Sequence, residues 1–146
     1  MPIEVKVGPP TITVSQGRTF MVTNQHGGIE ANTEQGVYAM DTRFINFYRV
    51  YMNREPLDVV NSSQVSFYAA RFHLTNRFLD TESDPISAQT IRVTLNRIVS
   101  EGIHEDIDIA NYTGKKVSFL LEIGMRSDFA DRFEVKSKHI ILRRCA

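Results

Sequence analysis

The strongest constraint on the fold is an alternating stretch at residues 115–125. Every second position in it is apolar: Val117, Phe119, Leu121, Ile123 and Met125. Neighbouring side chains of a β-strand point to opposite faces of its sheet, so a period of two predicts a strand with one face in a core. The alternation stops after this stretch. We therefore expect residues 126–135, which carry Asp128 and Asp131, to form a loop or a single turn at a sheet edge.

The rest of the chain repeats short apolar or β-branched runs broken by turn residues. Strands are expected at residues 11–14, 18–23, 42–53, 57–60, 65–69, 72–74, 89–99 and 103–112. About nine or ten short strands with turns roughly every 8–12 residues are typical of an all-β sandwich or barrel. The pattern predicts one domain over residues 1–146, all-β, built as an antiparallel β-sandwich.

Two strands carry more specific expectations. Both parities of residues 42–53 are apolar or aromatic, which predicts a strand covered on both faces. Residues 89–99 alternate, but Arg97 interrupts the inward-facing set and predicts a strand end. Asp106 and Asp108 are expected on an exposed strand face.

The balance of charge excludes several classes of partner. The 146 residues contain 17 Lys and Arg and 17 Asp and Glu. A nucleic-acid-binding surface needs a basic excess to neutralise phosphates, so we expect no nucleic-acid partner.

We find no signal peptide and no apolar run near the roughly 20 residues of a membrane span. With a single cysteine, Cys145, we expect a cytoplasmic protein without a membrane partner.

The C-terminal residues 139–146 resemble a strand that has just started. This pattern fits a fragment of a longer protein, and it fits equally an edge strand that closes the sheet.

Motifs that are typical of catalytic sites are scarce in this sequence. The sequence has no phosphate-binding glycine loop, no nucleophile elbow and no HExxH motif. The four histidines are far apart and lack the spacing of known zinc sites, so we expect no metal and no cofactor. Glycoside hydrolysis needs two carboxyl groups across a cleft. Asp41, Asp128, Asp131 and the Asp106/Asp108 pair are candidates. Turn formation and pairing with arginine account more simply for the first three, and solvation or cross-strand pairing with lysine accounts for the last two.

Two segments resemble a known family. Residues 128–135, DFADRFEV, closely resemble the DFADxFEV segment of bacterial amylo-α-1,6-glucosidases, the glycogen debranching-enzyme-like proteins. Residues 36–45, GVYAMDTRFI, are similar to the family's G-(L/F)-(Y/F)-x-x-D-T-R-(Y/F)-(L/I). The resemblance covers roughly residues 13–135, with both motifs in the expected order.

The resemblance implies an N-terminal β-domain of the supersandwich-like type, which precedes a helical (α/α)₆ domain that carries the catalytic carboxylates. We therefore expect a non-catalytic accessory domain, without hydrolase activity of its own, whose partner is that helical domain in cis or in trans. Two motif loops could pack against it or line its cleft: Asp41, Thr42, Arg43, Asp128, Phe129 and Asp131. Ala39 and Met40 stand where many relatives have a charged residue, which weakens the case for direct sugar contact there.

An independent carbohydrate-binding module is the alternative. Sugar sites use exposed aromatic rings, and Tyr38 and Tyr68 are the stacking candidates for an α-glucan. Tyr48 and Tyr51 are expected in a core or an interface instead. Excess apolar surface on residues 42–53 would also permit a homo-oligomer.

Overall fold

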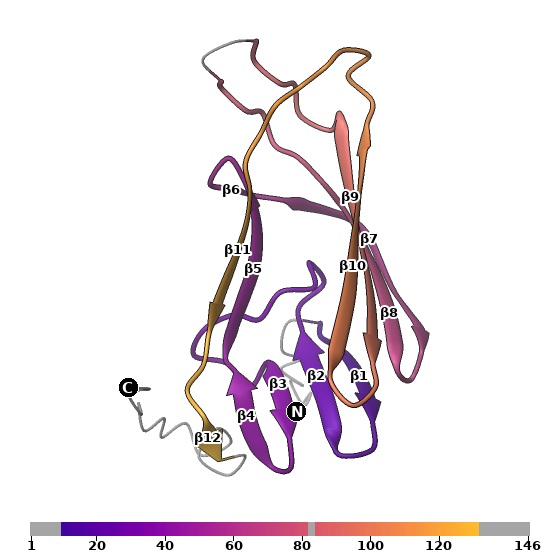
Figure 1. Cartoon of the computed structure of the whole chain (residues 1–146), viewed down its shortest axis with the longest axis vertical. Coiled ribbons are helices and arrows are strands. Elements are labelled where there is room, and N and C mark those ends of the chain that lie inside the picture. The colour runs from indigo at the N-terminus through magenta and orange to yellow at the C-terminus, as the bar shows by residue number, and fades with distance from the viewer. Residues whose placement is uncertain (1–9, 82–83, 132–146) are drawn as a thin grey trace, which may run out of the picture.

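The computed structural model describes residues 10–81 and 84–131, and within them every regular element is a β-strand (Figure 1). The strands form three antiparallel sheets. The first sheet has the order β1 (Ile12–Gln16), β2 (Thr19–Thr23), β3 (Gly36–Ala39), β4 (Thr42–Ile45) and β12 (Ala130–Asp131). The second has the order β10 (Ile103–Asn111), β9 (Ile91–Val99), β8 (Ala69–Thr75) and β7 (Asp58–Ser66). The third has the order β11 (Leu121–Arg126), β5 (Phe47–Met52) and β6 (Glu55–Pro56).

The core lies between the second sheet and the other two. Alternate residues of β8 and β9 face inward, and Phe72, Val93 and Leu95 are completely buried. Met52 of β5 and Val14 of β1 belong to the same cluster from the opposite side. Figure 1 shows β5 and β11 across from β9 and β10, with β1 to β4 beneath them. The predicted all-β, antiparallel, sandwich-like class is confirmed.

The hairpins predicted from local turn residues are present. The first pairs β1 with β2 around Gly17, whose φ of 61° is easily reached without a side chain. The alternating run that predicted a strand at 103–112 forms β10, which pairs with β9 along its whole length.

Three expected boundaries were wrong. Residues 42–53 form two strands with a break at Asn46, and β5 is covered on one face only, because Arg49 is exposed. In place of the strands expected at 57–60 and 65–69, one strand, β7, runs over Asp58–Ser66, because bulges absorb its irregular polar stretch. Phe67 and Tyr68 form the turn that follows, and Ala69 already belongs to β8. The strand expected from residue 115 starts only at Leu121, although Val117 and Phe119 still pack on the core.

Candidate functional site

The β3–β4 hairpin carries the first of the two motifs. Ala39 pairs with Thr42, so the turn consists of Met40 and Asp41 alone. Both turn residues have positive φ, 50° and 65°, which is the backbone of the two-residue turns that match strand twist. This turn is exposed, with Met40 at 75%. Thr42 is half-buried at the start of β4.

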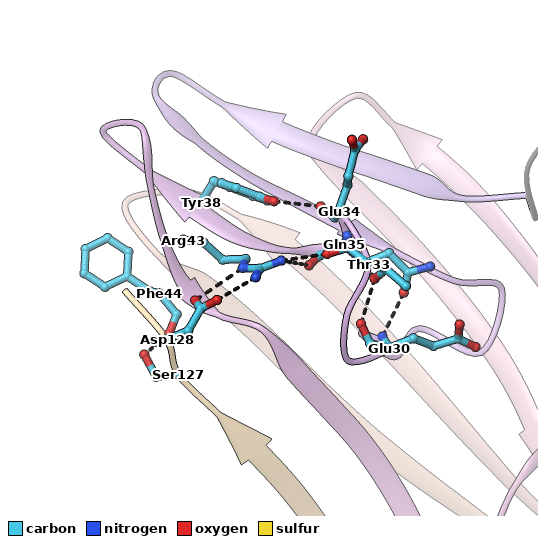
Figure 2. Close-up of polar contacts among 9 residues, drawn as sticks. All are labelled: Glu30, Thr33, Glu34, Gln35, Tyr38, Arg43, Phe44, Ser127 and Asp128. Carbon is cyan, nitrogen blue, oxygen red and sulfur yellow. Dashed lines mark hydrogen bonds and ion pairs between the residues drawn. The ribbon is translucent and has the colours of Figure 1, made fainter. Parts of the chain in front are cut away.

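The two motifs meet in a buried ion pair (Figure 2). The guanidinium of Arg43 donates from Nη2 to Oδ2 of Asp128 at 2.5 Å and from Nε to Oδ1 at 3.3 Å. Both side chains are only 1% exposed. A two-pronged contact of this kind matches the planar guanidinium to the planar carboxylate. The pair joins β4 to the segment just before β12, 85 residues further along the chain.

Arg43 also holds the loop that precedes β3. Its Nη1 donates to the backbone carbonyls of Thr33, at 2.8 Å, and Gln35, at 3.2 Å. Gly36 leaves the space for this side chain, since a Cβ there would lie 2.5 Å from Cδ of Arg43. The first glycine of the motif and its arginine are therefore parts of one packing arrangement.

The second motif is fixed around the same pair. Ser127 donates its hydroxyl to the carbonyl of Phe44, and the ring of Phe129 packs edge-on against Phe44 with centroids 5.8 Å apart. The backbone of Ala130 and Asp131 then pairs with β4 as β12. Asp128 is thus an internal tie between strands, and Phe129, with φ of 50°, turns the chain onto the sheet edge.

The two tyrosines expected to stack on a sugar, Tyr38 and Tyr68, differ in solvent exposure. Tyr38 is 3% exposed, its ring is stacked on Phe20 at 4.7 Å, and its hydroxyl donates to the carbonyl of Glu34. A sugar therefore cannot reach this ring in the structure. Tyr68 is 40% exposed at the β7–β8 turn and packs edge-on against the more exposed Phe67.

A second buried polar cluster was not anticipated from the sequence. Arg97 lies within β9 rather than at a strand end, and its side chain is fully buried. Its Nη2 donates to Glu105 Oε1 at 2.7 Å and to the carbonyl of Gly27 at 2.8 Å. Tyr48 donates its hydroxyl to the other oxygen of Glu105 at 2.5 Å. Burial, followed by the Glu105 carboxylate, raises the pKa of Tyr48 well above its ordinary value.

The sequence contains part of the information that indicates this buried cluster. Glu105 has the inward parity of β10, as Arg97 has in β9, and the two residues are paired across the strands. Opposite charges at inward, opposed positions indicate a buried pair. Cation–π contact of Arg97 with Phe72, 4.9 Å from the ring centroid, could not be read from the sequence.

The described part of the chain contains no group of three or more His, Cys, Asp or Glu side chains arranged to hold a metal ion. In the same residues we find no helix of the length and hydropathy needed to cross a membrane.

Comparison with known proteins places these motifs in a family. No curated protein matched the sequence. A model of the family described as the N-terminal domain of (some) glycogen debranching enzymes matches residues 14–145, which include both motifs and the strands around the Arg43–Asp128 pair. The chain belongs to this family of N-terminal domains of glycogen debranching enzymes.

Proposed function

We propose that the chain is a non-catalytic accessory domain of an amylo-α-1,6-glucosidase-like hydrolase, which packs against a helical (α/α)₆ catalytic domain and borders its substrate cleft. The observation that carries the proposal is the Arg43–Asp128 pair, which turns the two family-like motifs into one structural unit. The composition, with Cys145 as its single cysteine, suits the cytoplasm.

The state of the buried carboxylates supports an accessory role. A glycosidase acid or base must reach the scissile bond across a cleft. Asp128 is 1% exposed and both its oxygens accept from Arg43. Glu105 is 12% exposed and is held by Arg97 and Tyr48. Both carboxylates are therefore engaged within the domain.

The surface proposed to meet the helical domain is the outer side of the same unit. Met40 and Asp41 project at the β3–β4 turn, and Phe44 is 42% exposed beside Phe129. We call these four residues the motif surface. A combination of exposed apolar side chains and one carboxylate, on a backbone fixed from beneath by a buried ion pair, is suited to a preorganised contact.

Isothermal titration of the chain with the helical domain of a debranching-type hydrolase from the same genome tests this proposal. Met40→Glu places a charge at the centre of the motif surface and is expected to raise Kd at least tenfold, about 1.4 kcal/mol. Phe78→Glu is the matched control, because Phe78 is also exposed, at 58%, in the loop between β8 and β9. Equal effects of the two variants, or no complex at a concentration of about 100 μM, would contradict the proposal.

A second candidate function, binding of an α-glucan by the domain itself, is favoured by the Phe67–Tyr68 pair. The two rings are held at 80° with centroids 5.1 Å apart and are 68% and 40% exposed. Titration with maltooligosaccharides should then give saturable binding that the double variant Phe67→Ala, Tyr68→Ala abolishes. Binding that persists in this double variant, or no binding at millimolar sugar, would contradict a carbohydrate-binding function at these two rings.

A further inference from the structure

Two sheet edges border an apolar groove. Among the described strands, β10 pairs only with β9, and β11 pairs only with β5. Both strands line a groove of about 260 Å³, to which they contribute Ile107, Ile123 and Met125. Figure 1 shows β10 and β11 on opposite sides of the space between the layers, with the chain rising through β10 and descending through β11. The edge of a sheet presents backbone donors and acceptors that can pair with a further strand.

Core-facing side chains on both edges are exposed. Ile109 is opposite Val93 in β9, and Ile123 is opposite Val50 in β5; directly opposed residues of an antiparallel pair share a face. Val93 and Val50 are buried, whereas Ile109 is 44% and Ile123 45% exposed. Met125, also in β11, is 59% exposed. The apolar face of each layer therefore continues to the groove, where it leaves surface that a neighbouring molecule can bury.

The hydrogen bonds between β10 and β9 show which backbone groups of β10 point to the outer edge. In an antiparallel pair, residues whose backbone groups bond to the neighbouring strand alternate with residues whose groups point away from it. The amide of Tyr112, just after β10, donates to the carbonyl of Thr90 at 2.8 Å, in the register of the β9–β10 pair. The even-numbered residues of β10 therefore bond to β9, and the backbone groups of Ile107 and Ile109 point to the edge.

The same alternation holds in β11. The amide of Asn53, just after β5, donates to the carbonyl of Leu120 at 2.8 Å, in the register of the β5–β11 pair. The even-numbered residues of β11 therefore bond to β5, and the backbone groups of Ile123 and Met125 point to the outer edge. In both strands the outward-directed backbone groups belong to residues whose side chains are on the core face.

One symmetric arrangement of two copies satisfies both edges at once. A two-fold axis parallel to these strands places β10 of each copy beside β11 of the other, and the new pairs are antiparallel. When Ile107 is opposite Met125 of the second copy, Ile109 is opposite Ile123 of that copy. Residues with outward-directed backbone groups then meet as hydrogen-bonded pairs, and their apolar side chains lie together on the core face.

Charge on the outer face agrees with this register. The register sets Asp106 opposite Arg126 of the second copy, and both side chains are exposed. Asp108 is then opposite Gly124 of that copy, so no like charges meet there. If β10 paired instead with β10 of the second copy about Ile107, Asp106 would be opposite Asp108. Like charges directly opposite each other destabilise an antiparallel pair, so charge favours β11 as the partner of β10.

We propose that the β10–β11 side of the domain binds a second copy of this chain in a two-fold dimer, in which β10 of each copy pairs with β11 of the other and Ile109 and Ile123 close the groove. The polar residues of the groove lining, Tyr48 and Glu105, are bonded to each other, so an apolar occupant leaves neither without a partner. This inference does not depend on the proposed function.

Sedimentation velocity and amide exchange on the full chain test the proposal. The chain should dimerise with a Kd of about 100 μM or lower, and the amides of Ile107 and Ile109 should exchange at least about tenfold more slowly in the dimer than in dilute monomer. In a mixed-label sample, methyl NOEs between molecules should connect Ile109 with Ile123. A monomer at about 1 mM would overturn the proposal. So would protection of the two amides at every concentration, because another part of the same chain would then occupy the edge.

Exchange of the two opposed charges gives a second test. Asp106→Arg and Arg126→Asp should each raise Kd at least about tenfold, because each substitution opposes like charges at two places in the symmetric dimer. The double substitution restores opposite charges and should bring Kd to within about threefold of the wild type. Asp58→Arg is the matched control, since Asp58 is an exposed aspartate on β7, at the opposite edge of the second sheet. An equal effect of the control, or a double variant as weak as the single ones, would contradict the proposed pairing.

Discussion

Two arginine side chains, those of Arg43 and Arg97, are buried beside the apolar core. Arg43 and Arg97 are each 1% exposed. Arg43 is matched by a carboxylate and two backbone carbonyls, and Arg97 by a carboxylate and one backbone carbonyl. An unpaired buried charge costs several kcal/mol, so removal of one partner is far more harmful than the net value of the pair suggests. The side chains of Asp128 and Glu105 are thus fixed by their arginines.

Tyr48 should make stability fall at alkaline pH. Its pKa is raised in the folded state, so the unfolded chain loses this proton from about pH 10 while the folded chain keeps it. The free energy of unfolding should therefore be unaffected by this group below about pH 10 and decline above it, by up to about 1.4 kcal/mol per pH unit. Tyr48→Phe removes this contribution, which urea unfolding at pH 9 to about 11 would reveal as a flatter profile.

The control for this experiment is Tyr112→Phe, which alters a ring that is 69% exposed. Its profile should follow the wild type. Parallel profiles for Tyr48→Phe and the wild type would contradict the proton linkage assigned to Tyr48.

Sequence reasoning could foresee local features of the site but not its contacts. It marked Asp41, Arg43 and Asp128 because of their motifs, and it assigned turn formation and arginine pairing to them. The actual partner of Asp128 lies 85 residues away, and no local pattern specifies a contact of that range. Arg97 was misjudged because an inward arginine conflicts with an apolar period, although Glu105 opposite it resolves the conflict.

At the scale of elements, the β3–β4 hairpin carries the main constraints. Its turn needs positive φ at two residues that are not glycine, and its first strand must approach the Arg43 side chain closely at Gly36. Hairpins were well predicted because turn chemistry and alternation are local signals. The break at Asn46 and the bulges of β7 were not, because tertiary packing decides them.

Gly36→Ala should lower the free energy of unfolding by about 1–3 kcal/mol, because the new Cβ would meet Arg43 Cδ at 2.5 Å and the carbonyl oxygen of Ile45 at 2.7 Å. Urea unfolding measures the change. Gly102→Ala is the control, since a Cβ there has no neighbour within 4 Å. Equal stability of the two variants would refute the close packing.

Met40→Asn should raise the free energy of unfolding by about 0.5–1 kcal/mol, because asparagine tolerates the positive φ of this turn better than methionine. The chain already uses Asn53, with φ of 48°, at the same position of the two-residue β5–β6 turn. Met125→Asn, at a methionine that is 59% exposed within β11, is the control and should not stabilise the protein. A destabilised Met40→Asn variant would count against the strain.

At the scale of the whole molecule, one core cluster spans all three sheets. Segments far apart in the sequence are held together by contacts: β12 pairs with β4, and Arg43 is bonded to Asp128. The central claim is that this pair, which unites the two family-like motifs, is structural.

A double-mutant cycle of Arg43→Ala and Asp128→Ala, followed by urea unfolding, tests that claim most directly. Each single substitution should lower the free energy of unfolding by about 3–5 kcal/mol. The double substitution should lower it by less than the sum of the two single losses, with a difference of at least about 2 kcal/mol. The same cycle on the exposed Arg77–Asp58 pair, 48% and 51% exposed, should give a coupling below about 1 kcal/mol. Additive, small losses at Arg43 and Asp128 would contradict the claim.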